Sequence, residues 1–209
     1  MTRAGLWARG SPAYMDRQAV VFAEVEKLYA NATTTMGGWM WRNHTQWVAE
    51  KATQLANKYG ANVETVFCAA LLHDLGDSRY ERGDSTFDAW SWERGKSILK
   101  SAGYRKQQRD AILEAVRTHS CHPGHLPITI EGKIVSTADG MWHLQTSFFP
   151  AICFMNRPSS VSTYAEWQQW FIEKIERDFH KKMFFTDEQD EVREDFDALK
   201  RVFEAQPLG

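Results

Sequence analysis

The stretch "FCAALLHDLGDSRY", residues Phe67 to Tyr80, decides how this chain folds. An apolar run suited to a buried helix ends abruptly in His73, Asp74 and Asp77. Burying a charged group among hydrocarbon side chains is costly unless the group has a partner. These three titratable groups therefore need partners in the fold or a chemical task.

The composition indicates one globular domain. The chain has 209 residues, of which 43% are hydrophobic, and a formal net charge of -2. This charge predicts neither a nucleic-acid polymer nor an anionic membrane as a partner, and no apolar run approaches the roughly 18 residues of a membrane-spanning helix. The three scattered cysteines do not resemble a disulfide framework, and the first residues lack the features of a signal peptide. We expect a cytoplasmic protein.

Helix signals run through almost the whole chain. Apolar residues recur at helical spacing between capping residues and glycines. The expected helices cover residues 11–32, 39–60, 62–77, 85–103, 105–119, 129–144, 162–182 and 186–205. Expected starts are Ser11 with Pro12, Asn62, Ser85 with Asp88, Thr163 with Glu166, and Thr186 with Gln189; expected ends include Gly60 and Gly103. Without strand alternation or a sequence repeat, the pattern predicts a single-domain, all-α helical bundle spanning residues 1–209.

Four of these helices carry an imidazole or a carboxylate at or beside an apolar face. The residues are His44, the pair His73 and Asp74, His119, and Asp139. Neighbours on a helix point about 100° apart, so the pair can still face one cation in a groove beside another helix. A buried imidazole also occurs as a hydrogen-bonded core histidine, and a buried aspartate as a helix cap. For each residue taken alone, these alternatives remain open.

The order and context of these residues resemble the HD-domain superfamily of metal-dependent phosphohydrolases. The matching residues are His44 in "WRNHTQWV", His73 and Asp74 in "AALLHDLGD", and Asp139 in "EGKIVSTADGM". Other segments, such as "VRTHS" and "IEKIERDFHKKMFF", are similar to small uncharacterised bacterial and archaeal members. The resemblance implies a metal-site core at about 41–144, with C-terminal helices at about 162–204 packing on it.

The resemblance implies that His44, His73, Asp74 and Asp139 bind one divalent cation. Two neutral imidazoles and two carboxylates cancel its charge, and this donor mixture suits Mn²⁺, Fe²⁺, Co²⁺, Ni²⁺ or Mg²⁺, with Zn²⁺ also compatible. An acidic residue four positions after the motif histidine commonly orients or deprotonates the attacking water in the family, and Asp77 occupies that position. A second metal held through His119 is the alternative to one metal with His119 lining the pocket.

The predicted substrate is a small phosphorylated molecule, a nucleotide or another metabolite. We expect His119, Arg42, Arg79 and Lys133 to contact it, and Arg82 and Arg117 also lie near the proposed ligands along the sequence. Basic side chains gathered in this way bind phosphate, although a single arginine near a helix end is ordinarily solvated. The alternative functions are a di-iron oxygenase on the same scaffold and a non-catalytic, metal-containing ligand-binding or regulatory module.

Overall fold

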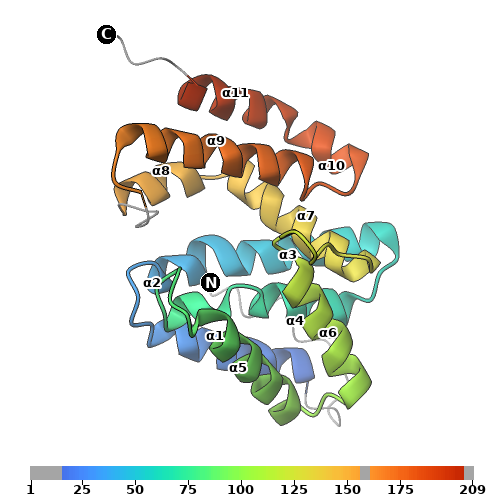
Figure 1. Ribbon diagram of the computed structural model, residues 1–209. Helices are drawn as coiled ribbons and strands as arrows, with labels where there is room; N and C mark the ends of the chain where they lie inside the picture. Colours follow the sequence, from blue (N-terminus) through green and yellow to red (C-terminus); the bar gives the residue numbers. More distant parts are fainter. Residues whose placement is uncertain (1–15, 156–160, 205–209) are drawn as a thin grey trace, which may run out of the picture.

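The described part of the chain is helical throughout. The structure is a computed structural model that describes residues 16–155 and 161–204, and it contains no strand in those ranges (Figure 1). The predicted all-α fold is therefore confirmed. The first described helix, α1 (Arg17–Ala30), is capped by Asp16, whose side chain accepts a hydrogen bond from the Gln18 amide. The start predicted at Ser11 and Pro12 lies outside the described residues.

The centre of the fold is α4 (Val63–Leu72), which packs against α1, α3 (Gln46–Tyr59), α6 (Lys106–Thr118) and α7 (Ile130–Gln145). Every residue from position 66 to 72 is buried, which explains the nearly continuous apolar run. As predicted, the Asn62 side chain caps this helix by accepting a hydrogen bond from the Thr65 amide. Residues that follow α4 consequently emerge in the interior.

The helix predicted over residues 39–60 is three consecutive elements. A short helix α2 (Gly37–Met40) leads into a π-helical turn η2 (Trp41–Thr45), and α3 follows directly. The predicted end at Gly60 is confirmed, with φ +67, a left-handed conformation that glycine adopts at little cost. Because η2 carries His44, the irregular turn lies at a predicted ligand, and π-turns often occur at functional sites.

The helix predicted over residues 62–77 is too long at its end. The α-helical hydrogen bonding of α4 ends at Leu72, and a 3₁₀ turn η3 (Leu75–Ser78) follows. The reason is tertiary, because Gly76 lies against α5 (Phe87–Ser101). A Cβ atom at Gly76 would lie 2.5 Å from Ser91 Oγ and 2.6 Å from Phe87 Cζ. Asp77 is thus presented from a 3₁₀ turn and not from an α-helix.

The capping box predicted at Ser85 and Asp88 is also wrong. Helix α5 begins at Phe87 after Thr86, which makes no side-chain capping bond. The acceptor is instead Asp84, whose Oδ1 binds the Thr86 amide at 2.8 Å and the Thr86 hydroxyl at 2.6 Å. An aspartate that binds the amide two residues on forms a turn of its own, and this turn delays the start of the helix.

The C-terminal elements pack over one side of the central bundle, across α7 (Figure 1). They are α8 (Phe148–Phe154), which the sequence did not predict, α9 (Tyr164–His180), α10 (Thr186–Glu191) and α11 (Arg193–Glu204). Helices α9 and α11 contact each other, and both contact α7. Among the described helices, none is long and apolar enough to cross a membrane.

The predicted starts of the last helices have opposite outcomes. The capping box of Thr163 and Glu166 is confirmed, with both reciprocal hydrogen bonds present. The one predicted for Thr186 and Gln189 is wrong, because α10 begins after Phe185 without a side-chain cap. Gln189 instead donates its side-chain amide to the Phe179 carbonyl oxygen, so a contact with α9 replaces the local bond.

Candidate metal centre

The four predicted ligands meet inside the protein. His44 comes from η2, His73 and Asp74 from the end of α4, and Asp139 from the middle of α7. We call these four residues the His-Asp cluster. All are buried, with exposed fractions between 0% and 6%. The helices α3, α4 and α7, or their immediate extensions, therefore supply the whole set, and their mutual packing brings the four together.

The ligand atoms have spacings that suit one cation. His44 Nε2 lies 2.8 Å from His73 Nε2, 3.3 Å from Asp74 Oδ2 and 3.5 Å from Asp139 Oδ1. His73 Nε2 lies 3.4 Å from Asp74 Oδ2 and 3.7 Å from Asp139 Oδ1. Two atoms that bind one metal at about 2.1 Å are themselves roughly 3.0–3.4 Å apart at octahedral or tetrahedral angles. The observed separations fall around this range.

Two further observations support a cation at the centre of the cluster. Asp139 Oδ1 is buried and has no hydrogen-bond partner among the described residues, although it faces both imidazoles. Burial alone would lower the pKa of His73, but Asp74 and Asp139 together raise this pKa above its ordinary value. The cluster therefore attracts positive charge, and its residues fit a divalent metal ion.

Hydrogen bonds outside the cluster orient two imidazoles toward it. His73 Nδ1 lies 2.7 Å from the Ala70 carbonyl oxygen, and His119 Nδ1 lies 2.6 Å from that of Val116. A carbonyl oxygen only accepts, so each Nδ1 carries the proton and each Nε2 keeps a free lone pair, as metal-binding histidines require. His119 Nε2 lies 3.7 Å from Asp74 Oδ1.

His119 is placed where the sequence predicted it, at the end of α6 and beside the cluster. Ligand atoms of His73, Asp74 and His119 all lie within 4.8 Å of one another, so these residues form a second possible metal-binding group. Burial lowers the pKa of His119 to about 3, which keeps the imidazole neutral near pH 7. Both predicted roles of His119, as a pocket residue and as a second-metal ligand, are compatible with this position.

Asp77 is also buried, but its carboxylate is bound to an arginine. Arg82 donates from Nε to Asp77 Oδ1 at 2.8 Å and from Nη2 to Asp77 Oδ2. The same Nη2 lies 2.6 Å from Asp74 Oδ1. Burial raises the pKa of Asp77, and Arg82 opposes this effect. The catalytic role of Asp77 stays a prediction, and its immediate partner is Arg82.

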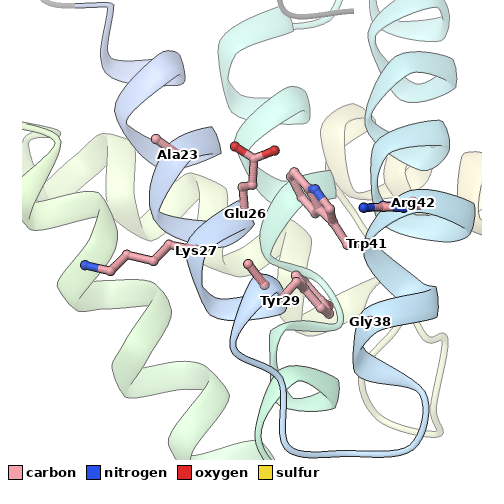
Figure 2. A pocket seen from close by; sticks show the side chains of 8 residues that line it. Ala23, Glu26, Lys27, Tyr29, Gly38, Trp41 and Arg42 are labelled. Atoms are coloured by element: carbon pink, nitrogen blue, oxygen red, sulfur yellow. The ribbon is translucent and has the colours of Figure 1, made fainter. Parts of the chain in front are cut away.

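Three basic residues that the sequence proposed for substrate binding take no part in the hydrogen bonds and ion pairs found for the cluster within the described residues. Arg42 is exposed on η2 and lines a surface groove of about 610 Å³ (Figure 2). Glu26 and Lys27 of α1 line the same groove. Arg79 is exposed after η3, and Lys133 is half-buried near the start of α7. Their role in substrate binding stays a prediction.

A second group of buried charges, which the sequence did not predict, lies behind Asp139. We call it the rear network, and its members are His143, Lys174, Asp178 and Lys182. Lys182 donates to Asp139 Oδ2, and His143 Nε2 lies 3.4 Å from Asp139 Oδ1. Asp178 Oδ2 accepts from Lys174 Nζ at 2.8 Å and lies 3.0 Å from His143 Nδ1.

The rear network has an electrostatic consequence for Asp139. Burial would raise the pKa of Asp139, but His143 and Lys182 lower it well below its ordinary value, so the carboxylate stays ionised. Burial lowers the pKa of His143 to about 4. The sequence did contain a signal for this network. Lys174 and Asp178 interrupt the buried stripe that Phe171, Ile175 and Phe179 form on α9.

The comparisons with known proteins agree with this geometry. Residues 41–141 match the family model described as the HD domain. This match supports membership of the HD-domain superfamily, whose members are generally metal-dependent phosphohydrolases. An uncharacterised protein from Clostridium beijerinckii is 33% identical over 66 residues, which are 31% of this chain and 41% of that protein. The match thus spans about two fifths of that relative's length. No solved structure matches the chain significantly.

Proposed function

We propose that this protein is a metal-dependent phosphohydrolase that acts on a nucleotide or another small phosphorylated metabolite. The observation that carries the proposal is the convergence of His44, His73, Asp74 and Asp139 with one carboxylate oxygen left unpaired toward the imidazoles. These residues would hold a divalent cation. When bound, such an ion lowers the pKa of a coordinated water toward neutrality and polarises a phosphoryl oxygen.

The charge of the site supports an anionic substrate. The His-Asp cluster, Asp77, Arg82 and the rear network together contain four carboxylates and three basic side chains. With neutral imidazoles, the site alone has one excess negative charge, and a divalent cation turns this into one excess positive charge. An anion such as a phosphate ester is therefore attracted only when the metal is present.

The protein's own groups have definable tasks in this reaction. His73 is oriented by the Ala70 carbonyl oxygen, so it presents a lone pair without reorganisation. Lys182 and the rear network keep Asp139 ionised and fix one of its two oxygens, leaving the other toward the cluster. His119 is neutral and beside Asp74, and because its Nδ1 carries the proton, its Nε2 can only accept a hydrogen bond from a bound substrate.

The second candidate is oxygenase chemistry with two iron ions. It is favoured by the second group of possible ligands, His73, Asp74 and His119, which shares two residues with the His-Asp cluster. Hydrolysis needs no change in the oxidation state of a metal, whereas an oxygenase needs iron and O₂. The two functions therefore differ in a measurement that requires no knowledge of the natural substrate.

The test is metal analysis followed by a substrate screen. The purified protein is stripped of metal and assayed on p-nitrophenyl phosphate and nucleoside monophosphates with Mn²⁺, Fe²⁺, Co²⁺, Ni²⁺, Mg²⁺ or Zn²⁺, with and without oxygen. We expect turnover with a redox-inert ion, lost in His73→Ala and Asp74→Ala. His180→Ala, which removes an exposed imidazole paired with Glu176, is the matched control. Turnover that requires both iron and O₂ would support the oxygenase, and no turnover of any of these esters would count against the hydrolase.

A further inference from the structure

Arg82 connects the buried cluster to solvent. Its side chain is 51% exposed, whereas those of its partners Asp74 and Asp77 are 8% and 5% exposed. It lies five residues after Asp77, in the loop between η3 and α5. Along the sequence it is one of several basic residues near the predicted ligands. The structure separates it from Arg42, Arg79 and Lys133, because it contacts a predicted metal ligand directly.

The guanidinium of Arg82 uses only part of its donor capacity. Nε and Nη2 bind the two oxygens of Asp77, and Nη2 also binds Asp74 Oδ1. Within residues 16–155 and 161–204, no hydrogen bond involves Nη1. A planar guanidinium has donors along more than one edge, and the arrangement leaves one edge available for a further oxygen ligand.

The orientation of Arg82 is set by the residues around it. The carboxylate of Asp77 engages it with two parallel bonds, and its Cζ lies 5.0 Å from the centroid of the Phe87 ring. Phe87 is held close to η3 because Gly76 has no side chain. The guanidinium is therefore pre-organised before any ligand arrives, which lowers the entropic cost of binding an anion.

Asp74 relates Arg82 to the expected cation. Its Oδ2 faces His44 and His73, while its Oδ1 faces Arg82. The Asp74 carboxylate thus lies between the predicted metal position and the Arg82 guanidinium. A ligand with several anionic oxygens on one atom, such as a phosphoryl group, can satisfy a metal ion and a neighbouring guanidinium together.

We propose that Arg82 binds the phosphoryl group of the substrate through its free edge, and that Asp77 is the positioning residue that holds Arg82 in place. This inference rests on the proposed function and deepens it by naming the residue that recognises phosphate. It assigns Asp77 a different task from the water-activating role that the family resemblance implies. The two roles for Asp77 lead to different experimental results.

The test uses inorganic phosphate as a probe, because its binding can be measured without turnover. Calorimetry on the metal-loaded protein gives the phosphate dissociation constant, and kinetics gives KM and kcat separately. We expect Arg82→Gln to weaken phosphate binding and raise KM about tenfold to a hundredfold, as for the loss of a hydrogen bond between charged groups. Arg82→Lys keeps the charge but lacks the planar fork, so it should fold and bind metal while recovering only part of the phosphate affinity.

Asp77→Asn distinguishes the positioning role from a catalytic one. If Asp77 acts through Arg82, Asp77→Asn weakens phosphate binding about threefold to tenfold, and adding it to Arg82→Gln costs little more, because residues in one network are not additive. If Asp77 activates the water, Asp77→Asn lowers kcat with unchanged phosphate affinity, and its effect multiplies with that of Arg82→Gln. The second result would overturn the assignment of Asp77.

Controls separate this inference from the proposed function. Arg94→Gln removes an arginine that pairs with Glu24 on α1, away from the cluster, and should leave phosphate binding unchanged. Equal phosphate affinity in wild type and Arg82→Gln, with equal metal content, would overturn the role of Arg82. So would a metal-loaded wild type that binds no phosphate. A protein that binds phosphate through Arg82 but hydrolyses no ester would refute only the proposed hydrolase activity.

Discussion

Metal removal is the perturbation that tests the His-Asp cluster most directly. A ligand that binds only the folded state at a free concentration of 100 times its dissociation constant stabilises that state by about 2.7 kcal/mol. For a chain of this size, each kcal/mol shifts the unfolding temperature by about 2–4 °C. We therefore expect a divalent ion that fits the cluster to raise Tm by about 5–11 °C at this concentration.

At neutral pH the protonation states of the cluster favour metal binding, so the metal should raise Tm. Burial lowers the pKa of His44, so this ligand needs no deprotonation before it binds a metal. Asp74 also stays ionised, because burial raises its pKa less than Arg82 and His73 lower it. In His73→Ala the metal loses one of two imidazoles, and the shift should shrink by most of its size.

The assay is calorimetric unfolding of metal-stripped protein with increasing Mn²⁺ or Mg²⁺. The quantity compared is the metal-induced change in Tm within each variant, so a change in the stability of the metal-free protein does not affect the comparison. His180→Ala serves again as the control and should keep the full shift. A wild-type Tm that no divalent ion changes would refute the metal centre, as would an undiminished shift in His73→Ala.

Three further predictions concern the surroundings of the cluster. Lys182→Met leaves Asp139 buried without its ammonium partner. In urea unfolding, the free energy of unfolding should fall by about 3–5 kcal/mol in metal-free protein and by less with Mn²⁺. Equal losses under the two conditions would contradict the pairing. Gly140→Ala should destabilise the protein by about 1–3 kcal/mol, since its Cβ would lie 3.0 Å from the Asp178 carbonyl oxygen. Gly95→Ala is the control and should not destabilise the protein, because its Cβ meets only an ordinary contact at 3.5 Å. Metal-free protein should lose stability below about pH 6.5, because the unfolded chain takes up a proton that buried His119, with its pKa lowered to about 3, does not. At pH 5 the free energy of unfolding should be lower by about 2 kcal/mol. If the stability of a His119→Asn variant falls equally steeply with pH, the cause is not His119.

The predictions that succeeded from sequence rest on local physics. A capping side chain at Asn62 or Thr163 binds an amide within three residues, and Gly60 ends a helix by its own left-handed backbone. The buried face of a helix is also readable, because apolar residues recur at its period. One wrong helix boundary depends on a tertiary contact: Gly76 lies against Phe87, and the turn there replaces the last predicted α-helical residues.

The candidate site also contains residues that the sequence predicts and a residue that only the structure selects. His44, His73, Asp74 and Asp139 stand out in the sequence because each interrupts or borders an apolar stripe, and the order of these residues matches a known family. The choice of Arg82 over Arg42, Arg79 and Lys133 is not readable there, since all four are near ligands along the chain. Only the path of the loop after η3 brings the Arg82 guanidinium to Asp74.

The contact between Lys182 and Asp139 is the clearest case of a feature that only the tertiary structure decided. The two residues are 43 positions apart, and they meet because α9 packs across α7 and Thr137 binds the Lys182 carbonyl oxygen. Helical periodicity predicts which face of each helix is buried, but it does not predict which two buried faces meet. The sequence by itself therefore determined most of the helices and the four predicted ligands, while the charged surroundings of these ligands followed from the packing of helices that are distant along the chain.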